Sequence, residues 1–356
     1  MADLTHALHT RSDWISDVCG DIEQHADTIL QVCSYHRLDF DLVVIRTRPH
    51  EMQPVQSSLQ SAFETLPTAG LGILDRLPME LMWLTLHEFD ILSLFRFRQV
   101  NRQARIISAG LREYNLVSRY GLEGLRGLLR ARLASHFTIR DLYKPLITDK
   151  CSTCGEFGGH LFLPTVERCC FHCLLNLPFY RVFALSTFAK LVKMSPGRLD
   201  RLLGQKLRTV PGIYNMLEAP SRRPKHLIAM DKAIETLVAI KAIGQDAICR
   251  LIISREQGNK RFMAATAYPY YNLKDAKLER GVSCKGCQIR CQRRYGGFLL
   301  EEPFFTARGF LSHFSQCIEA QQHWTASEKG TRPVDEPPIT RYCGYFSKLG
   351  PDGLPA

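Results

Sequence analysis

The sequence predicts a mainly α-helical protein that also carries small cysteine-containing modules of mixed helix and strand. Two observations predict this fold class. Between residues 77 and 133, leucines and other apolar residues recur every three or four positions, which is the period of one face of an α-helix. Further along the chain, cysteines occur in Cys-x-x-Cys pairs among short predicted elements.

The segment from residue 77 to residue 105 predicts three short amphipathic helices in close succession. Its sequence is LPMELMWLTLHEFDILSLFRFRQVNRQAR. Pro78 suits the first turn of a helix, where its missing N–H costs nothing, and the helix dipole favours Glu80 in the same turn. Asp90 is expected to cap the second helix. Helices this short are stable only when they pack together or against a partner.

Apolar positions within this segment exceed what a small helical unit can bury. Leu77, Leu81 and Leu84 lie on one predicted helical stripe, and Val100 begins the apolar face of the third helix. An exposed apolar face usually marks an interface, so the segment predicts a docking surface.

The segment resembles the F-box over about residues 71–120. The matching positions are Leu77, Pro78, Glu80, Leu81, Ile91, Leu94, Arg98, Val100, Asn101 and Arg105. Met79 and the pair Met82–Trp83 depart from the pattern but remain apolar. The resemblance implies binding to the Skp-type adaptor of a cullin–RING ubiquitin ligase through Leu77, Pro78, Leu81, Leu84, Ile91, Leu94 and Val100. The alternative is an ordinary helical hairpin within a larger core.

Length and composition predict an intracellular globular protein. The chain has 356 residues, which allows about two domains. It has no run of apolar residues long enough for a membrane span, and its first residues lack the pattern of a signal peptide. We therefore expect a cytoplasmic or nuclear location and no membrane association. Thiols stay reduced in these compartments, so the 13 cysteines favour metal sites over disulfides.

The first cysteine group predicts a four-thiolate metal site. Cys151 and Cys154 form one Cys-x-x-Cys pair, and Cys170 and Cys173 form a second pair after 15 intervening residues. Two such turns bring four thiolates around one tetrahedral ion. Gly155, Gly158 and Gly159 are expected to allow tight backbone geometry at the first turn. Cys169 and His172 lie beside the second pair and are alternative ligands.

The second group combines a cysteine pair with a histidine and a cysteine on a predicted helix. Cys284 and Cys287 come first, and His313 and Cys317 follow after a linker of 25 residues. His313 and Cys317 are four residues apart, which places them one turn apart on the same side of a helix. This order is typical of a zinc finger with a longer linker than usual, and Cys291 is an alternative ligand. The remaining cysteines show no partner spacing and are expected to be small apolar residues.

Both groups predict zinc in a structural role, because four protein ligands leave no open position for a reacting water. The sequence also contains none of the phosphate-binding, dinucleotide-binding, nucleophile-elbow or metalloprotease motifs. We therefore expect no catalytic residue and no enzyme activity.

The order of linker-like, helical and cysteine-containing segments predicts four regions in the chain. Residues 1–68 are expected to be divergent or partly disordered, with a strand at 42–45 and a linker at 48–70. Residues 71–120 are expected to form the F-box-like unit, residues 121–330 a helical, zinc-stabilised substrate-recognition region, and residues 331–356 an irregular tail. Within the third region Ser195 is expected to cap a helix, and a long helical pattern over 224–253 is expected to break at Gly244.

The combination of an F-box-like segment with both cysteine groups resembles fungal F-box proteins with cysteine-rich C-terminal segments. The matching motifs read CSTC at 151–154, RCCFHC at 168–173, VSCKGCQ at 282–288 and GFLSHFSQC at 309–317. The resemblance implies a non-catalytic receptor that recruits a protein target to a Skp–cullin–RING ligase. The net charge of +11 supports an alternative, a nucleic-acid-binding zinc-finger regulator, although scattered arginines are also typical of a solvated surface.

Overall fold

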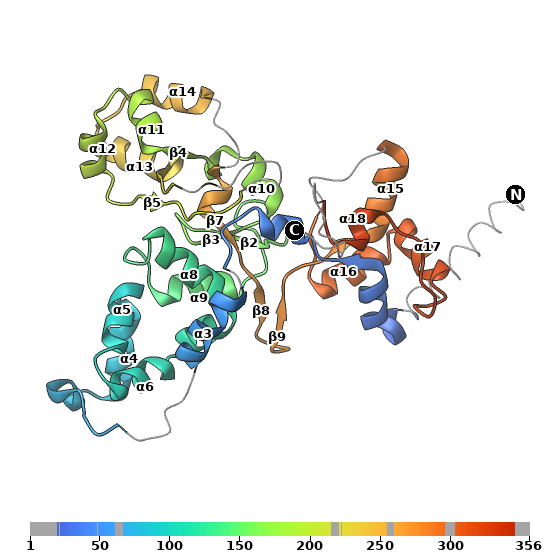
Figure 1. Ribbon diagram of the computed structural model, residues 1–356, viewed down its shortest axis with the longest axis horizontal. Coiled ribbons are helices and arrows are strands. Elements are labelled where there is room, and N and C mark those ends of the chain that lie inside the picture. Colours follow the sequence, from blue (N-terminus) through green and yellow to red (C-terminus); the bar gives the residue numbers. More distant parts are fainter. Residues whose placement is uncertain are drawn as a thin grey trace, which may run out of the picture. The chain divides into compact units, whose positions relative to one another are not determined.

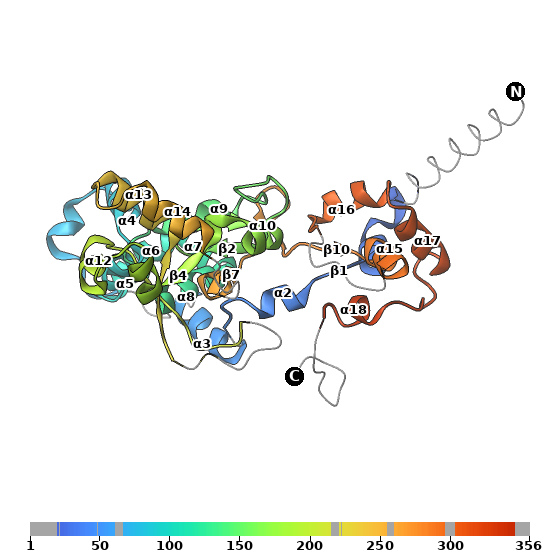
Figure 2. The same cartoon turned by 90° about the horizontal axis from the view of Figure 1, so that it is seen from above.

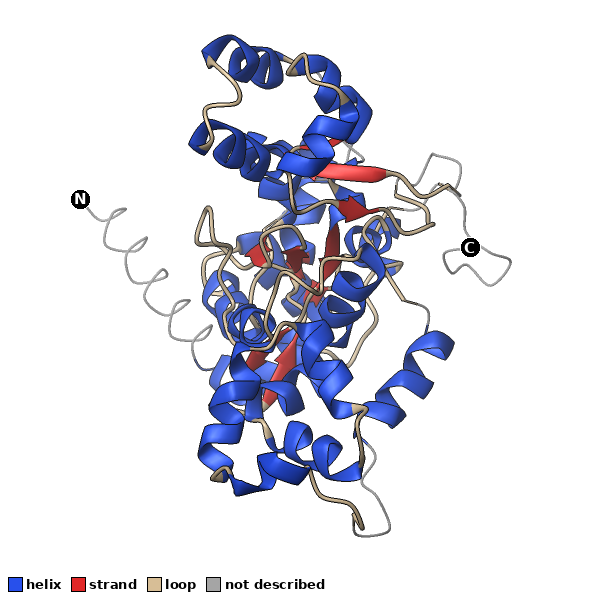
Figure 3. Ribbon diagram, turned by 90° about the vertical axis from the view of Figure 1, so that its left-hand side faces the viewer, coloured by secondary structure: helices blue, strands red, loops and turns tan. Residues whose placement is uncertain are grey.

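The computed structural model describes residues 20, 22–47, 49–60, 67–214, 221, 223–254, 260–295 and 303–345. The protein is mainly helical, with small sheets of two or three short strands (Figure 3). It divides into two compact units. We call residues 41–278 the central unit, and residues 1–40 together with 279–356 the terminal unit. Within the described residues, every helix is too short or too polar to cross a lipid bilayer.

The first half of the central unit is a succession of short helices. They are α3 (Pro49–Gln60), the 3-10 helix η1 (Gly72–Arg76), α4 (Met79–Glu88), α5 (Ile91–Arg98), α6 (Arg102–Gly110), α7 (Arg112–Tyr120), α8 (Leu122–Ala131) and α9 (Ile139–Leu146). Polar caps set several starting points. The carboxylate of Asp90 accepts a hydrogen bond from the Ser93 backbone at the start of α5, as the sequence predicts, and Asn101 does the same for Ala104 at the start of α6.

The second half of the central unit mixes short strands with further helices. The helical elements are α10 (Phe171–Asn176), η2 (Pro178–Tyr180), α11 (Leu185–Leu191), α12 (Pro196–Leu202), α13 (Met230–Ala239), α14 (Gln245–Ile253) and η4 (Phe262–Ala264). Figure 1 shows α11 to α14 grouped apart from α3 to α9 within this unit. Ser195 caps α12 as expected. The helical pattern predicted over 224–253 is wrong at its start, where residues 226–229 form a strand, and the rest divides into α13 and α14 with Gly244 preceding α14.

Two three-stranded antiparallel sheets lie in the central unit. In the first, β2 (His160–Phe162) pairs with both β3 (Glu167–Cys169) and β7 (Ala265–Ala267). In the second, β6 (His226–Ala229) pairs with both β4 (Val182–Ala184) and β5 (Leu207–Arg208). A separate hairpin joins β8 (Tyr270–Asn272) to β9 (Lys277–Glu279). The first sheet therefore brings residues near 160 and 266 together, far apart in the sequence.

One large apolar core joins the helices to the first sheet. Ile91, Leu94 and Leu142 from the helices are fully buried in the same cluster as Leu161 of β2 and Tyr268, which follows β7. The Tyr268 hydroxyl donates a hydrogen bond to the Leu142 carbonyl at 2.9 Å. The helices at 79–120 are thus part of the central unit's core, and the four sequence-predicted regions do not correspond to separate compact bodies.

A second, smaller apolar cluster holds α11 to α14 on the second sheet. Phe183, Phe188, Leu199 and Leu251 are fully buried within it. The apolar faces of α11 and α12 pack into this cluster, so the polar faces of the two helices point outward to solvent.

The terminal unit is built from two segments at opposite ends of the chain. Residues 22–33 are helical and lead into β1 (Ser34–Tyr35), which pairs with β10 (Ser283–Cys284). The further helices are α15 (Lys285–Tyr295), α16 (Ala307–Phe314), α17 (Ile318–Ala326) and α18 (Pro338–Arg341). Figure 2 shows α15, α16 and α17 around the β1–β10 pair. The short helix α2 (Leu38–Leu42) follows β1 and leads into the central unit.

The two segments of the terminal unit share a core and a buried ion pair. Ile29 and Cys33 pack with Phe310 and Phe314, all of them fully buried or nearly so. Arg37 and Asp39 form a buried ion pair at 2.6 Å, and the backbone N–H of Tyr345 donates to the Asp39 carboxylate at 3.2 Å. The N-terminal segment is therefore held by residues about 300 positions away.

Two sequence-based expectations within residues 42–70 are wrong. Residues 49–60 of the expected 48–70 linker form α3, and the expected strand at 42–45 reduces to one bridge between Ile45 and Thr266. In both cases the apolar partners come from distant parts of the sequence, which local patterns do not reveal. The described part of the 331–356 tail is irregular apart from α18. The first 19 residues and residues 346–356 lie outside the described part of the chain.

A buried arginine fastens the central unit together. The guanidinium of Arg168 donates to the backbone carbonyls of Pro145, at the end of α9, and of Gly158, before β2. It also donates to the carbonyls of Tyr268 and Pro269, between β7 and β8. Burial lowers the pKa of Arg168 to about 10, so it remains charged at neutral pH.

We predict that Arg168→Ala destabilises the central unit by about 3 kcal/mol or more, because it leaves buried carbonyls without donors. The measurement is urea denaturation followed by circular dichroism. The exposed Arg198 is the matched control, and Arg198→Ala should change the unfolding free energy by less than about 0.5 kcal/mol. Equal stability of the two variants would contradict the role given to Arg168.

Candidate metal centres and an exposed helix face

The first metal centre brings together Cys151, Cys154, Cys170 and Cys173. One sulfur from each lies within 4.8 Å of all the others. Cys151 and Cys154 lie on the turn between α9 and β2, Cys170 caps α10, and Cys173 lies in the first turn of that helix. The Sγ atoms of Cys154 and Cys170 are 3.6 Å apart. A tetrahedral ion bound by thiolates at about 2.3 Å would place them about 3.8 Å apart, so this spacing fits a metal.

Local backbone geometry explains why the first cysteine pair converges. The backbone N–H of Gly155 donates to the Cys151 carbonyl at 3.0 Å and closes a tight turn. Gly155 has a φ of 78°, which glycine adopts without strain. Gly158 serves a different purpose, because a Cβ there would lie 2.6 Å from the Arg168 side chain. Both glycines were expected at this turn, but only Gly155 has a positive φ.

The second centre brings together Cys284, Cys287, His313 and Cys317 within the same 4.8 Å limit. The Sγ atom of Cys317 lies 3.8 Å from that of Cys284 and 3.9 Å from that of Cys287. The Sγ atom of Cys287 lies 3.3 Å from Nε2 of His313. The ring of His313 stacks on Phe305 with centroids 4.7 Å apart, which fixes its orientation. Part of the linker at 296–302 lies outside the described residues.

The alternative ligands lie outside both quartets. Burial raises the pKa of Cys169 well above its ordinary value, which keeps it a neutral thiol. His172 is exposed, and its Nδ1 lies 3.3 Å from the amide of Asn176, one turn along α10. Cys291 is buried on α15, one turn beyond Cys287. The structure thus selects the eight residues that the spacing favours.

The thiols of the first quartet differ in their tendency to ionise. Burial raises the pKa of Cys173 to about 12, whereas hydrogen bonds, that with Cys170 first, lower the pKa of Cys151 to about 4. Thiolates this close repel one another, and a bound cation would offset their charge. Either quartet can hold a metal ion, and four protein ligands close its coordination shell. The two centres differ in accessibility, because Cys154 is exposed while the three cysteines of the second centre are buried.

The structure also places an apolar surface on η1 and α4. Leu77, Leu81 and Leu84 are 40%, 48% and 56% exposed, whereas Met82 and Leu86 face the core. Pro78 precedes α4 and is exposed as well. We call the exposed apolar residues of this segment the α4 face: Ile73, Leu74, Leu77, Met79, Leu81 and Leu84.

Two of the seven residues that the sequence analysis assigned to the docking surface lie in the core instead. Ile91 and Leu94 are fully buried in the core, because α5 packs between its neighbours. Val100 is 67% exposed, in the turn between α5 and α6. The amide of the next residue, Asn101, donates to the Gly70 carbonyl at 2.8 Å, which holds this turn beside the start of η1.

Sequence reasoning missed Ile73, Leu74 and Met79 as members of the exposed surface. Met79 lies outside the three-and-four spacing that identified the stripe on α4, whereas Ile73 and Leu74 continue that spacing four and three residues before Leu77. The available signal was the apolar pair that follows Gly72, before the helix begins.

Polar contacts fasten α4 to the rest of the central unit. His87, in the last turn of α4, contacts the carboxylate of Glu113 on α7 at 3.1 Å. Arg140 on α9 lies 3.9 Å from the same carboxylate and 2.8 Å from the other ring nitrogen of His87. This network, together with the buried Met82 and Leu86, sets the orientation of the α4 face.

Comparison with protein-family models, with curated proteins and with solved structures finds no match to this chain.

Each centre should bind its own ion. We predict two metal ions per chain in the wild-type protein, and one in Cys284→Ser and one in Cys151→Ser, counted by native mass spectrometry. The exposed Cys249 lies outside both quartets, so Cys249→Ser should retain both ions. A wild-type protein with fewer than about two ions would rule out at least one centre.

The network around Glu113 predicts a pH-dependent contribution to stability. Burial raises the pKa of Glu113, but hydrogen bonds from its own backbone and from His87, and the charge of Arg140, outweigh that effect and lower it. Stabilisation is therefore present at neutral pH and is lost as the pH falls through the folded-state pKa. Glu113→Gln should reduce the unfolding free energy at neutral pH by about 1 kcal/mol or less, and the difference should vanish in acid.

The measurement is urea denaturation over a series of pH values. Glu235 is the control, because its ion pair with Lys232 lies on the exposed side of α13. Glu235→Gln should show little effect at any pH, and a pH-independent loss in Glu113→Gln would contradict the electrostatic explanation.

Proposed function

We propose that this protein is a non-catalytic receptor of the F-box type, and that the α4 face is its docking surface for a Skp-type adaptor of a cullin–RING ubiquitin ligase. The observation that carries the proposal is the exposure of Leu77, Leu81 and Leu84 beside Pro78, within the segment that resembles the F-box. Burying one leucine contributes on the order of 2 kcal/mol, so leaving several exposed is costly unless a partner covers them.

The corrected burial pattern changes the composition of the proposed docking surface. Ile91 and Leu94 lie in the same buried cluster as Met82 and Leu86 of α4, and the residues available to a partner are those of the α4 face together with Val100. Apolar side chains of this kind provide the anchors of a protein–protein interface, with polar residues at the rim.

We further propose that both metal centres bind zinc in a structural role. Four cysteines, or three cysteines and one histidine, are the ligand sets of structural zinc sites. Zinc at such sites contributes on the order of 10 kcal/mol of apparent folding free energy. The first centre would stabilise the sheet that follows α9, and the second would join β10, α15, α16 and the start of α17. In this proposal the surfaces after residue 120 recruit the protein target.

Adaptor capture tests the docking surface. Wild-type protein is immobilised and exposed to a purified Skp-type adaptor, and bound adaptor is measured by surface plasmon resonance. We expect the double variant Leu77→Asp/Leu81→Asp to reduce binding at least tenfold, because charged groups on the α4 face would have to be desolvated.

The matched control is Ile252→Asp/Ile253→Asp, which changes two aliphatic residues that are 51% and 78% exposed at the end of α14. It should bind the adaptor as the wild type does. Equal binding by the Leu77→Asp/Leu81→Asp variant and the wild type would exclude the proposed docking surface. Elemental analysis of the same wild-type preparation identifies the metal.

A further inference from the structure

A strongly basic surface lies on α11, α12 and their connection. Between residues 190 and 208 the sequence has six cationic side chains and a single carboxylate, Asp200. That carboxylate forms an ion pair with Lys206. We call the exposed cations of this segment the α11–α12 basic face: Lys190, Lys193, Arg198 and Arg201.

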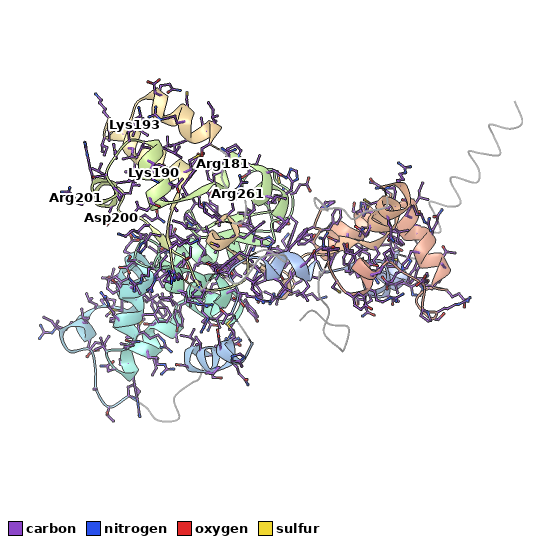
Figure 4. All side chains as sticks on the ribbon, turned by 45° about the horizontal axis from the view of Figure 1, so that its top comes forward. Arg181, Lys190, Lys193, Asp200, Arg201 and Arg261 are labelled. Carbon is purple, nitrogen blue, oxygen red and sulfur yellow. The ribbon has the colours of Figure 1, made fainter. Side chains whose placement is uncertain are left out.

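Packing forces these four side chains outward. Phe188 and Leu199 occupy the inner sides of α11 and α12 and are fully buried. Arg198 and Arg201 are three residues apart, so they share one side of α12. Figure 4 labels Lys190, Lys193 and Arg201 around α11 and α12, with Asp200 beside Arg201.

The charges of the basic face are not neutralised by nearby carboxylates. Among the described residues, none of the four cations forms an ion pair, and Arg201 donates instead to the Gly197 carbonyl at 3.3 Å. Arg250 on α14 donates to the Leu191 carbonyl at 2.8 Å and adds a cation beside the end of α11. Asp246, in the first turn of α14, is the carboxylate that this helix contributes. A carbonyl partner positions a guanidinium without cancelling its charge, so the face stays strongly positive.

The chemistry around the charges identifies the class of partner. None of the large apolar residues between positions 181 and 208 is exposed, so α11 and α12 themselves offer neither the apolar anchors of a peptide-binding site nor the side chains that insert into a membrane; the exposed Ile252 and Ile253 lie at the end of α14. Phe183 and Phe188 are fully buried and cannot stack on bases. What remains is a set of long cationic side chains that can contact phosphates.

We propose that the α11–α12 basic face binds the phosphodiester backbone of a nucleic acid without sequence preference. Neither metal centre contributes a residue to this face, and the proposal does not depend on adaptor docking. Without base contacts the affinity is that of non-specific binding, with a Kd of about 1–100 μM at physiological salt. The chain's net charge of +11 assists the approach of such a partner.

The test measures fluorescence anisotropy of 20-nucleotide duplex DNA, duplex RNA and single-stranded RNA over a series of salt concentrations. Each lysine or arginine that contacts a phosphate contributes about 0.9 to the slope of log K against log salt for duplex DNA. We expect the variant Lys190→Ala/Lys193→Ala/Arg198→Ala/Arg201→Ala to lower the duplex DNA slope by about 3 to 4. The three probes identify which nucleic acid the face prefers.

The matched control removes four exposed cations elsewhere in the central unit: Arg112, Arg119, Lys274 and Lys277. Its slope should equal that of the wild type. Equal losses in the two variants would assign binding to net charge alone and overturn the proposal. It would also fail if wild-type protein binds no probe at low salt, or if polyglutamate competes as well as nucleic acid at equal charge.

Circular dichroism melting curves establish that both quadruple variants remain folded. The variants Lys190→Ala and Arg198→Ala should each lower the slope by about 1, which keeps the test valid if the quadruple variant unfolds. Adaptor binding by the basic-face variant separates this proposal from the proposed function, because it should be unchanged.

Discussion

The central unit depends on a buried cation, the guanidinium of Arg168. It donates to carbonyls at the end of α9, before β2 and after β7, segments more than 120 residues apart in the sequence. Its neighbour, Cys169, lies opposite His160 in the pairing of β3 with β2, and Cys170 belongs to the first cysteine quartet, which can hold a metal ion. The same short strand therefore carries the charged group that joins distant loops and leads directly to the metal centre. A buried charge is tolerated here because hydrogen bonds replace its lost hydration.

The second quartet of candidate metal ligands also connects elements that are distant in the sequence. The second quartet joins β10 and α15 to α16 and the start of α17, around a core that also includes Ile29 and Cys33 of the N-terminal segment. Short elements of this kind bury little apolar surface, and the zinc ion proposed for this quartet would offset the cost of ordering them. The terminal unit could therefore combine residues 22–40 with residues beyond 279, although its apolar core is small.

The exposed surfaces divide into two chemical types. The α4 face is apolar and rests on a rigid support, formed by Met82, Leu86 and the contacts of His87 with Glu113 and Arg140. The α11–α12 basic face is cationic and has no exposed aliphatic anchor. An apolar face gains free energy from burial in a close-fitting partner, whereas a cationic face gains it by releasing counterions from a polyanion. The two proposed partners, a folded adaptor and a nucleic acid backbone, follow from this difference.

The sequence by itself determined the helical class, the caps at Asp90 and Ser195, and the two quartets that its spacing favours, with Cys169, His172 and Cys291 as alternative ligands. These features depend on spacing within a few residues, or on two cysteine pairs whose ligand chemistry has few alternatives. Only the tertiary structure decided that Ile91 and Leu94 are core residues, that residues 49–60 form a helix, and that the N-terminal segment packs with residues beyond 279. An amphipathic pattern shows that a residue is apolar and on which side of its helix it lies. Whether that side faces the protein's own core or a partner depends on contacts between residues distant in the sequence, which local periodicity does not encode.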